Sequence, residues 1–80
     1  MHRVSMKPGD FPDRVLLRGF EGGAVHTAER DGKFYVIEDE STMAGLLDEE
    51  DLDGLELVKV FEFSTLGDRA AYVDARGWSA

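Results

Sequence analysis

The dipeptide Asp31-Gly32 constrains the fold of this chain more than any other feature. It separates two strand-like runs within the stretch AVHTAERDGKFYVIE. A two-residue Asp-Gly loop is a strong hairpin signal, because a type I′ turn needs positive φ at both of its central residues. The two runs then alternate between the faces of a sheet. The predicted facing pairs are Arg30–Lys33, Ala28–Tyr35 and His26–Ile37, with Phe34 and Val36 on one face and Tyr35 and Ile37 on the other.

Two further stretches are predicted to be strands. Residues 14–20, RVLLRGF, form a short apolar run that ends at a glycine and an aromatic residue. Residues 55–63, LELVKVFEF, carry apolar side chains on both faces near the middle. That pattern is typical of a strand that is covered on both sides. One face carries Leu55, Leu57, Lys59, Phe61 and Phe63, and the other carries Glu56, Val58, Val60 and Glu62.

A short helix is predicted between these strands, in the stretch DESTMAGLLDEED. Ser41 or Thr42 can cap it, and the acids just before them lie where the helix dipole favours negative charge. The spacing of Met43, Leu46 and Leu47 makes one apolar stripe.

A second short helix is predicted over residues 65–76, where Thr65 and Asp68 have the spacing of a capping box. Leu66, Ala70 and Val73 recur at helical spacing, and Gly77 can end the helix. The rival interpretation is a strand that pairs with the preceding one. Trp78 either folds back onto the sheet or lies exposed.

The expected fold class is therefore α+β, a small and mostly antiparallel sheet with two short helices in the order β-β-β-α-β-α. Eighty residues fit a single domain, residues 1–80. Residues 1–13, which include two prolines, are predicted to be an irregular N-terminal arm. The chain has no cysteine, no long apolar run and no apolar stretch like that of a secretory signal. We therefore expect a cytoplasmic protein that does not enter a membrane.

Negative charge is concentrated in one part of the chain. Of the net charge of −8, residues 38–62 contribute −9, with ten acids against Lys59 alone. Residues 1–37 contribute +1 and residues 63–80 contribute 0. Such asymmetry within a small domain indicates a partner of opposite charge. Direct binding of nucleic acid is not predicted, because the acidic segment would repel phosphates and no large basic cluster offsets it.

The acidic segment resembles a calcium loop only in part. Glu49, Asp51, Asp53 and Gly54 match the first, third, fifth and sixth positions of an EF-hand loop. The twelfth position, which needs a bidentate acid, is Val60. We therefore predict no metal site and no cofactor.

Catalysis is not predicted either. A nucleophile needs an adjacent base, and the two histidines lie in the N-terminal arm and in a strand. Ser41, Ser64 and Thr65 are explained as helix caps. A chain of 80 residues also leaves little room for a concave pocket.

The stretch LLDEEDLDGLE, residues 46–56, has an ordinary structural interpretation. Asp48 can cap a turn, Asp53-Gly54 can form a tight turn, and Glu49 and Glu50 can be solvated. A high-salt proteome would also favour acids, but it would acidify the whole surface. Localised acid instead suits mimicry of a duplex, in which carboxylates occupy a groove lined with Arg and Lys.

In size, charge and layout, with its acids in EDESTMAGLLDEEDLDGLE, the chain resembles the small inhibitors of phages and mobile elements. Anti-CRISPR proteins and other DNA mimics are the nearest class. The resemblance implies a non-enzymatic inhibitor that binds a basic nucleic-acid-binding surface of a CRISPR-Cas subunit or nuclease and blocks target DNA. The candidate contacts are Glu38, Asp39, Glu40, Asp48, Glu49, Glu50, Asp51, Asp53, Glu56 and Glu62.

Two alternative functions stay open from the sequence. One is an immunity protein or antitoxin that acts against a nuclease toxin. The other is an accessory domain whose acids only solvate it. A homodimer is also possible, because an edge strand such as residues 14–20 can pair with its copy.

Overall fold

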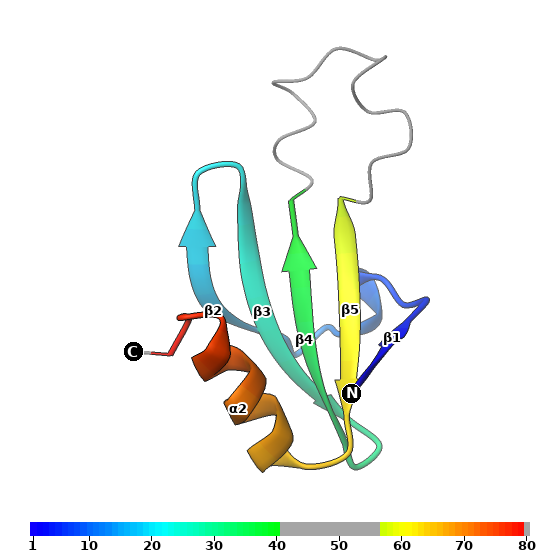
Figure 1. The fold of residues 1–80 in the computed structure, drawn as a ribbon. Helices are drawn as coiled ribbons and strands as arrows, with labels where there is room; N and C mark the ends of the chain where they lie inside the picture. The colour runs from blue at the N-terminus through cyan, green and yellow to red at the C-terminus, as the bar shows by residue number, and fades with distance from the viewer. Residues whose placement is uncertain (41–56, 80) are drawn as a thin grey trace.

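The computed structural model describes residues 1–40 and 57–79, and its framework is an antiparallel sheet in the order β1-β5-β4-β3-β2 (Figure 1). The strands are β1 (His2–Val4), β2 (Val15–Phe20), β3 (Gly23–Arg30), β4 (Lys33–Asp39) and β5 (Val58–Phe63). The helix α2 (Leu66–Ala75) lies across one face, and a short 3-10 helix, η1 (Pro8–Asp10), precedes β2. The predicted α+β class and the antiparallel pairing are confirmed.

The hairpin predicted from Asp31-Gly32 is confirmed in its turn and its register. Asp31 has φ of 53° and Gly32 has φ of 77°, as a type I′ turn requires. The three facing pairs expected from the sequence all occur between β3 and β4. The turn therefore fixes which side chains of β4 reach each face of the sheet.

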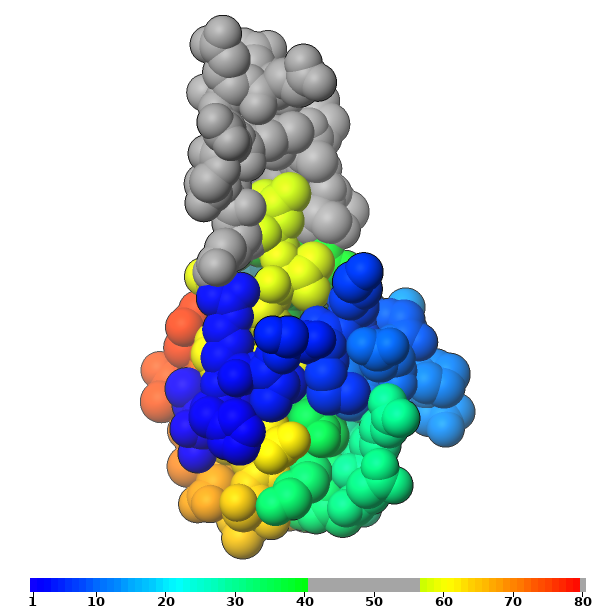
Figure 2. All heavy atoms as spheres, turned by 90° about the vertical axis from the view of Figure 1, so that its right-hand side faces the viewer, coloured from blue at the N-terminus to red at the C-terminus, as the bar shows by residue number. Residues whose placement is uncertain are grey.

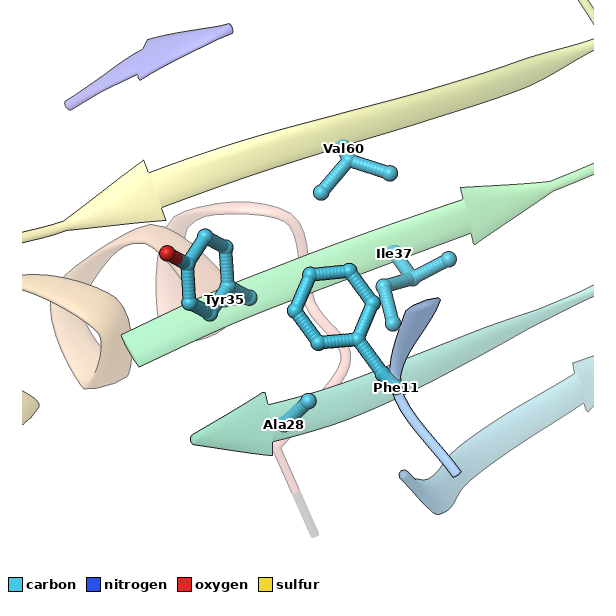
Figure 3. Packing of buried hydrophobic residues seen from close by; sticks show 5 residues of the cluster. All are labelled: Phe11, Ala28, Tyr35, Ile37 and Val60. Carbon is cyan, nitrogen blue, oxygen red and sulfur yellow. The ribbon is translucent and has the colours of Figure 1, made fainter. Parts of the chain in front are cut away.

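Both faces of the sheet carry a buried apolar cluster, and β4 contributes to each. Val36 and Ile37, neighbours in the sequence, are both 0% exposed because they point to opposite faces. Val36 packs on the α2 face with Val25, Phe63 and Val73. On the other face, called here the N-terminal face, the buried cluster is Phe11, Ala28, Tyr35, Ile37 and Val60 (Figure 3).

The N-terminal residues are not an irregular arm throughout, and they add a strand that the sequence did not predict. β1 pairs with β5 at the edge of the sheet, so the strand order differs from the expected one. Beyond β1, the chain lies across the N-terminal face beside β5 and β4 (Figure 2). The ring of Phe11 is 3% exposed and sits among the side chains of that face (Figure 3). A strand of three residues gives no visible periodicity, and each residue pairs with one that lies 56 or more positions away in the sequence.

The helix predicted over residues 65–76 is confirmed as α2, and the rival strand is wrong. The backbone N–H of Asp68 donates to Thr65 Oγ1 at 3.1 Å, and Gly77 ends the helix with φ of 74°. The predicted apolar stripe is only partly right, because Leu66 is 53% exposed and Ala70 is also exposed. The stripe fails because its spacing does not show which side of so short a helix meets the sheet.

The side of α2 that meets the sheet carries Arg69, Tyr72 and Val73. Arg69 Nη1 donates to the Ala28 carbonyl oxygen at 2.9 Å, and burial lowers the pKa of its guanidinium. Trp78 folds back toward the sheet, with its ring centroid 6.1 Å from that of Phe20. Of the two alternatives for Trp78, the structure therefore selects the packed one.

Two other predictions concern residues that lie wholly or partly outside the described ranges. The helix expected to start at Ser41 or Thr42 lies outside them, so one α-helix, not two, is present in the described part of the chain. The strand predicted over residues 55–63 is described from Val58 onward. Within residues 1–40 and 57–79, no helix has the length and apolar character that crossing a membrane would require.

Candidate functional site

The structure describes four of the ten carboxylates predicted as partner contacts. These are Glu38, Asp39, Glu40 and Glu62. The other six, which lie outside the described residues, are Asp48, Glu49, Glu50, Asp51, Asp53 and Glu56.

Glu38 lies on the α2 face and is engaged within the fold. Its side chain is only 11% exposed, and its Oε1 lies 3.5 Å from Arg76 Nη2. The hydroxyl of Tyr72 donates to Glu38 Oε2 at 2.6 Å. Burial and the negative charge of Glu38 raise the pKa of Tyr72 to about 12. The carboxylate of Glu38 therefore helps hold α2 against the sheet.

Glu62 is engaged in a similar way on the N-terminal face. The hydroxyl of Tyr35 donates to Glu62 Oε2 at 2.9 Å. His2 Nε2 lies 3.3 Å from Glu62 Oε1, and the Glu62 side chain is 20% exposed. Burial raises the pKa of Tyr35, and the hydrogen bond to Glu62 raises it further. Glu62 thus links β5 to β4 and to the first residues of the chain.

Glu38 and Glu62 point to opposite faces of the sheet, so these two described acids do not belong to one continuous face. The alternation of side chains along each strand could have predicted these opposite faces from the sequence. Glu38 follows Phe34 and Val36 at strand spacing, and Glu62 follows Val60. A count of charge along the chain ignores that alternation and therefore places the two glutamates together.

Asp39 and Glu40 lie instead at the end of β4. The Glu40 backbone N–H donates to the Leu57 carbonyl oxygen at 2.6 Å, which extends the pairing toward β5. Beside them is a hollow of about 90 Å³ that is also lined by Glu21, in the turn between β2 and β3. Antiparallel pairing thus brings Glu21 next to Asp39 and Glu40, although Glu21 lies 18 positions before Asp39 in the sequence. We call Glu21, Asp39 and Glu40 the acidic end of the sheet.

Gly23 makes this end of the sheet possible. A Cβ at Gly23 would lie 2.6 Å from the Asp39 carbonyl oxygen and 3.2 Å from the Glu40 Cα. Only glycine lets the backbones of β3 and β4 approach this closely. The sequence did not predict this contact, because it depends on a strand that is distant from Gly23 in the sequence.

The described part of the chain is close to charge balance. Residues 1–40 and 57–79 hold eleven of the 17 acids and all nine Lys and Arg residues, a net charge of −2. Residues 41–56 hold the other six acids and no base. Most of the net charge therefore belongs to the stretch that connects β4 to β5.

A hollow of about 460 Å³ lies between the N-terminal segment and β3. Arg14 and Arg30 line it together with Asp10, Asp13 and Glu29. Arg14 Nη1 donates to the Phe11 carbonyl oxygen, and Arg30 Nη1 donates to that of Asp10. These guanidinium groups fasten the N-terminal segment, and the lining holds no serine or histidine that could act as nucleophile or base.

The histidines and acids of the described residues do not form a metal centre. No group of three or more His, Asp or Glu side chains is placed to hold an ion in residues 1–40 and 57–79. His26 Nδ1 is buried and has no hydrogen-bond partner among these residues. Comparison with protein-family models, with curated proteins and with solved structures gives no match for this chain.

Proposed function

We propose that this protein is a non-enzymatic inhibitor that binds a basic nucleic-acid-binding surface of a CRISPR-Cas complex and blocks target DNA. One observation carries the proposal: six acids and no base lie in residues 41–56, while the described residues are nearly neutral. Like charges repel one another, so this concentration destabilises the chain unless a partner neutralises it. A groove lined with Arg and Lys is such a partner.

The contacts in this proposal are fewer than the ten first predicted. Asp39 and Glu40 at the acidic end lie where the chain enters residues 41–56, and the six acids of that stretch follow. Glu38 and Glu62 are left out because the hydroxyls of Tyr72 and Tyr35 donate hydrogen bonds to their carboxylates within the fold. The proposal thus has the folded sheet as a scaffold and one stretch of chain as the binding surface.

Two triple variants with equal net charge test the proposal. The first replaces Glu49, Glu50 and Asp51 with Lys. The control replaces Asp13, Glu29 and Asp74, all exposed on the described surface, with Lys. Each variant moves the net charge from −8 to −2, because each removes three negative charges and adds three positive ones. The two variants therefore have the same net charge and differ in the position of the three charge reversals.

The assay is target-DNA binding by a panel of purified CRISPR-Cas complexes, measured by gel shift. The natural chain should block DNA at low salt and lose potency as salt rises, since screening weakens charge contacts. The first variant should be at least about tenfold weaker, whereas the control should inhibit like the natural chain. Equal inhibition by the two variants, or none by the natural chain, would overturn the proposal. Inhibition of a nuclease toxin instead would identify an immunity protein.

A further inference from the structure

β2 is an edge strand that exposes three large apolar side chains. It pairs with β3 and has no second neighbour among the described residues. Val15 is 63% exposed, Leu16 is 58% exposed and Phe20 is 43% exposed. Edge strands in monomeric proteins are commonly short or protected by Lys or Pro. β2 has six residues and contains neither Lys nor Pro, although it carries Arg18 and a bulge. β1, at the opposite edge, has three residues.

A bulge in β2 changes which side chains share a face. Leu16 pairs with His26 and Arg18 pairs with Val25, so Leu17 is an additional residue between the two pairs. Leu17 packs with the cluster on the α2 face, and Arg18 also lies on that face, opposite Val25. The residues on the α2 face are therefore Val15, Leu17, Arg18 and Phe20. Those on the N-terminal face are Leu16 and Gly19.

This pattern is symmetric about the bond between Leu17 and Arg18. In an antiparallel pair, residues directly opposite each other point to the same face. For two copies of β2, that condition holds at every position in one register, with Val15 opposite Phe20, Leu16 opposite Gly19, and Leu17 opposite Arg18. Shifting the register by one residue either way places α2-face residues opposite N-terminal-face residues.

We propose that a second copy of this chain pairs with β2 in this register and joins the two sheets into one. The charges flanking the strand are complementary in the same register, because Arg14 of each copy stands opposite Glu21 of the other. Gly19 leaves open space for the opposing Leu16, since nothing lies within 4 Å of where its Cβ would be. Both α2 helices would lie on the same face of the joined sheet. The dimer is independent of the proposed inhibition.

The choice of a second copy as occupant follows from this self-complementarity. The face pattern, the Arg14–Glu21 pairs and the match of Leu16 to Gly19 all arise from one sequence meeting itself. Each paired contact occurs twice across the two-fold axis, as a symmetric dimer interface requires.

Sedimentation equilibrium of the full chain tests whether the dimer exists. The natural chain should show twice the chain mass as concentration rises. Val15→Lys should return it to the monomer mass, because the charge lies within the apolar side of the pair. Leu66→Lys is the matched control, since Leu66 is 53% exposed but lies at the start of α2. A natural chain that stays monomeric up to the millimolar range would overturn the proposal.

Cysteine cross-linking tests the register, because the natural chain has no cysteine. Facing Cα atoms in an antiparallel pair are about 4.5–5.5 Å apart, within reach of a disulfide. A mixture of Val15→Cys and Phe20→Cys chains should therefore form a mixed covalent dimer under mild oxidation. Each variant alone should stay largely uncrosslinked. Efficient cross-linking of Val15→Cys with itself would contradict the register.

Discussion

On each face of the sheet, a tyrosine hydroxyl donates a hydrogen bond to a glutamate of a neighbouring element. Tyr35 binds Glu62 across the β4–β5 pair, and Tyr72 connects α2 to Glu38 in β4. A carboxylate removed from water is stabilised by such donors. These glutamates therefore belong to the fold, although a count of charge places them with the acids proposed to bind a partner.

The two tyrosines predict how stability depends on pH at the alkaline end. They are the only tyrosines in the chain, and both have a raised pKa, that of Tyr72 moving from 10.0 to about 12. The folded state holds these protons more tightly than the unfolded state, so their stabilisation is complete below pH 10 and is lost as pH rises toward 12. The free energy of unfolding, measured in urea, should fall across that interval.

The Tyr72→Phe variant tests whether Tyr72 contributes to this pH dependence. Its free energy of unfolding should fall less steeply above pH 10. At neutral pH it should be lower than that of the natural chain by about 1–2 kcal/mol, because the hydrogen bond to Glu38 is lost. Absorbance titration of tyrosinate in the folded chain should show both groups ionising above their ordinary pKa of 10.0. Midpoints at the ordinary value for both tyrosines would contradict the prediction.

Gly23 and Gly19 form a matched pair for a second prediction at single residues. Gly23→Ala should destabilise the fold by about 1–3 kcal/mol, because the new Cβ would meet backbone atoms of Asp39 and Glu40. Gly19→Ala should change stability by less than about 0.5 kcal/mol, since its Cβ would have open space. Urea denaturation of both variants measures the difference. Equal stabilities would show that β3 and β4 do not approach as closely as described.

Among the elements, the N-terminal segment contributes more than its short pieces of regular structure indicate. η1 turns the chain so that Phe11 reaches the N-terminal face, and the Phe11 backbone N–H donates to the Pro8 carbonyl oxygen at 3.0 Å. The ring then lies 4.7 Å from that of Tyr35, measured between centroids. This segment supplies the apolar cover that a helix supplies on the other face.

Removing that cover should therefore be costly. Phe11→Ala should destabilise the chain by about 3–5 kcal/mol, because it removes a buried aromatic ring and leaves a cavity on the sheet. Leu66→Ala is the control, because the Leu66 side chain is 53% exposed. Its free energy of unfolding should change by less than about 0.5 kcal/mol. Urea unfolding followed by tryptophan fluorescence measures both. A dispensable arm would instead leave the Phe11→Ala variant as stable as the control.

Over the whole molecule, stability and charge are divided between different parts of the chain. The described residues bury two apolar clusters and have a net charge of −2, whereas residues 41–56 contribute −6. In the proposed inhibitor, reversing charge in that stretch would therefore alter binding while the clusters stay as they are. The two equal-charge triple variants separate these effects.

Local sequence was sufficient for the elements whose causes are local. Asp31-Gly32 specified the β3–β4 turn and its register, and Thr65, Asp68 and Gly77 specified the ends of α2. These features need only nearby residues, because turn geometry and capping act over a few positions. The side of α2 that packs on the sheet was not predictable in the same way. It depends on where the chain turns after β5.

The sequence by itself determined the hairpin, the helix ends, the α+β class and the location of the excess acid. Only the tertiary structure decided that β1 joins β5, that Phe11 covers a face of the sheet, and that Glu38 and Glu62 are held by tyrosines. The physical reason is that each of these contacts joins residues far apart in the chain. Their pairing depends on the order of strands in the sheet, which leaves no periodic pattern in the sequence.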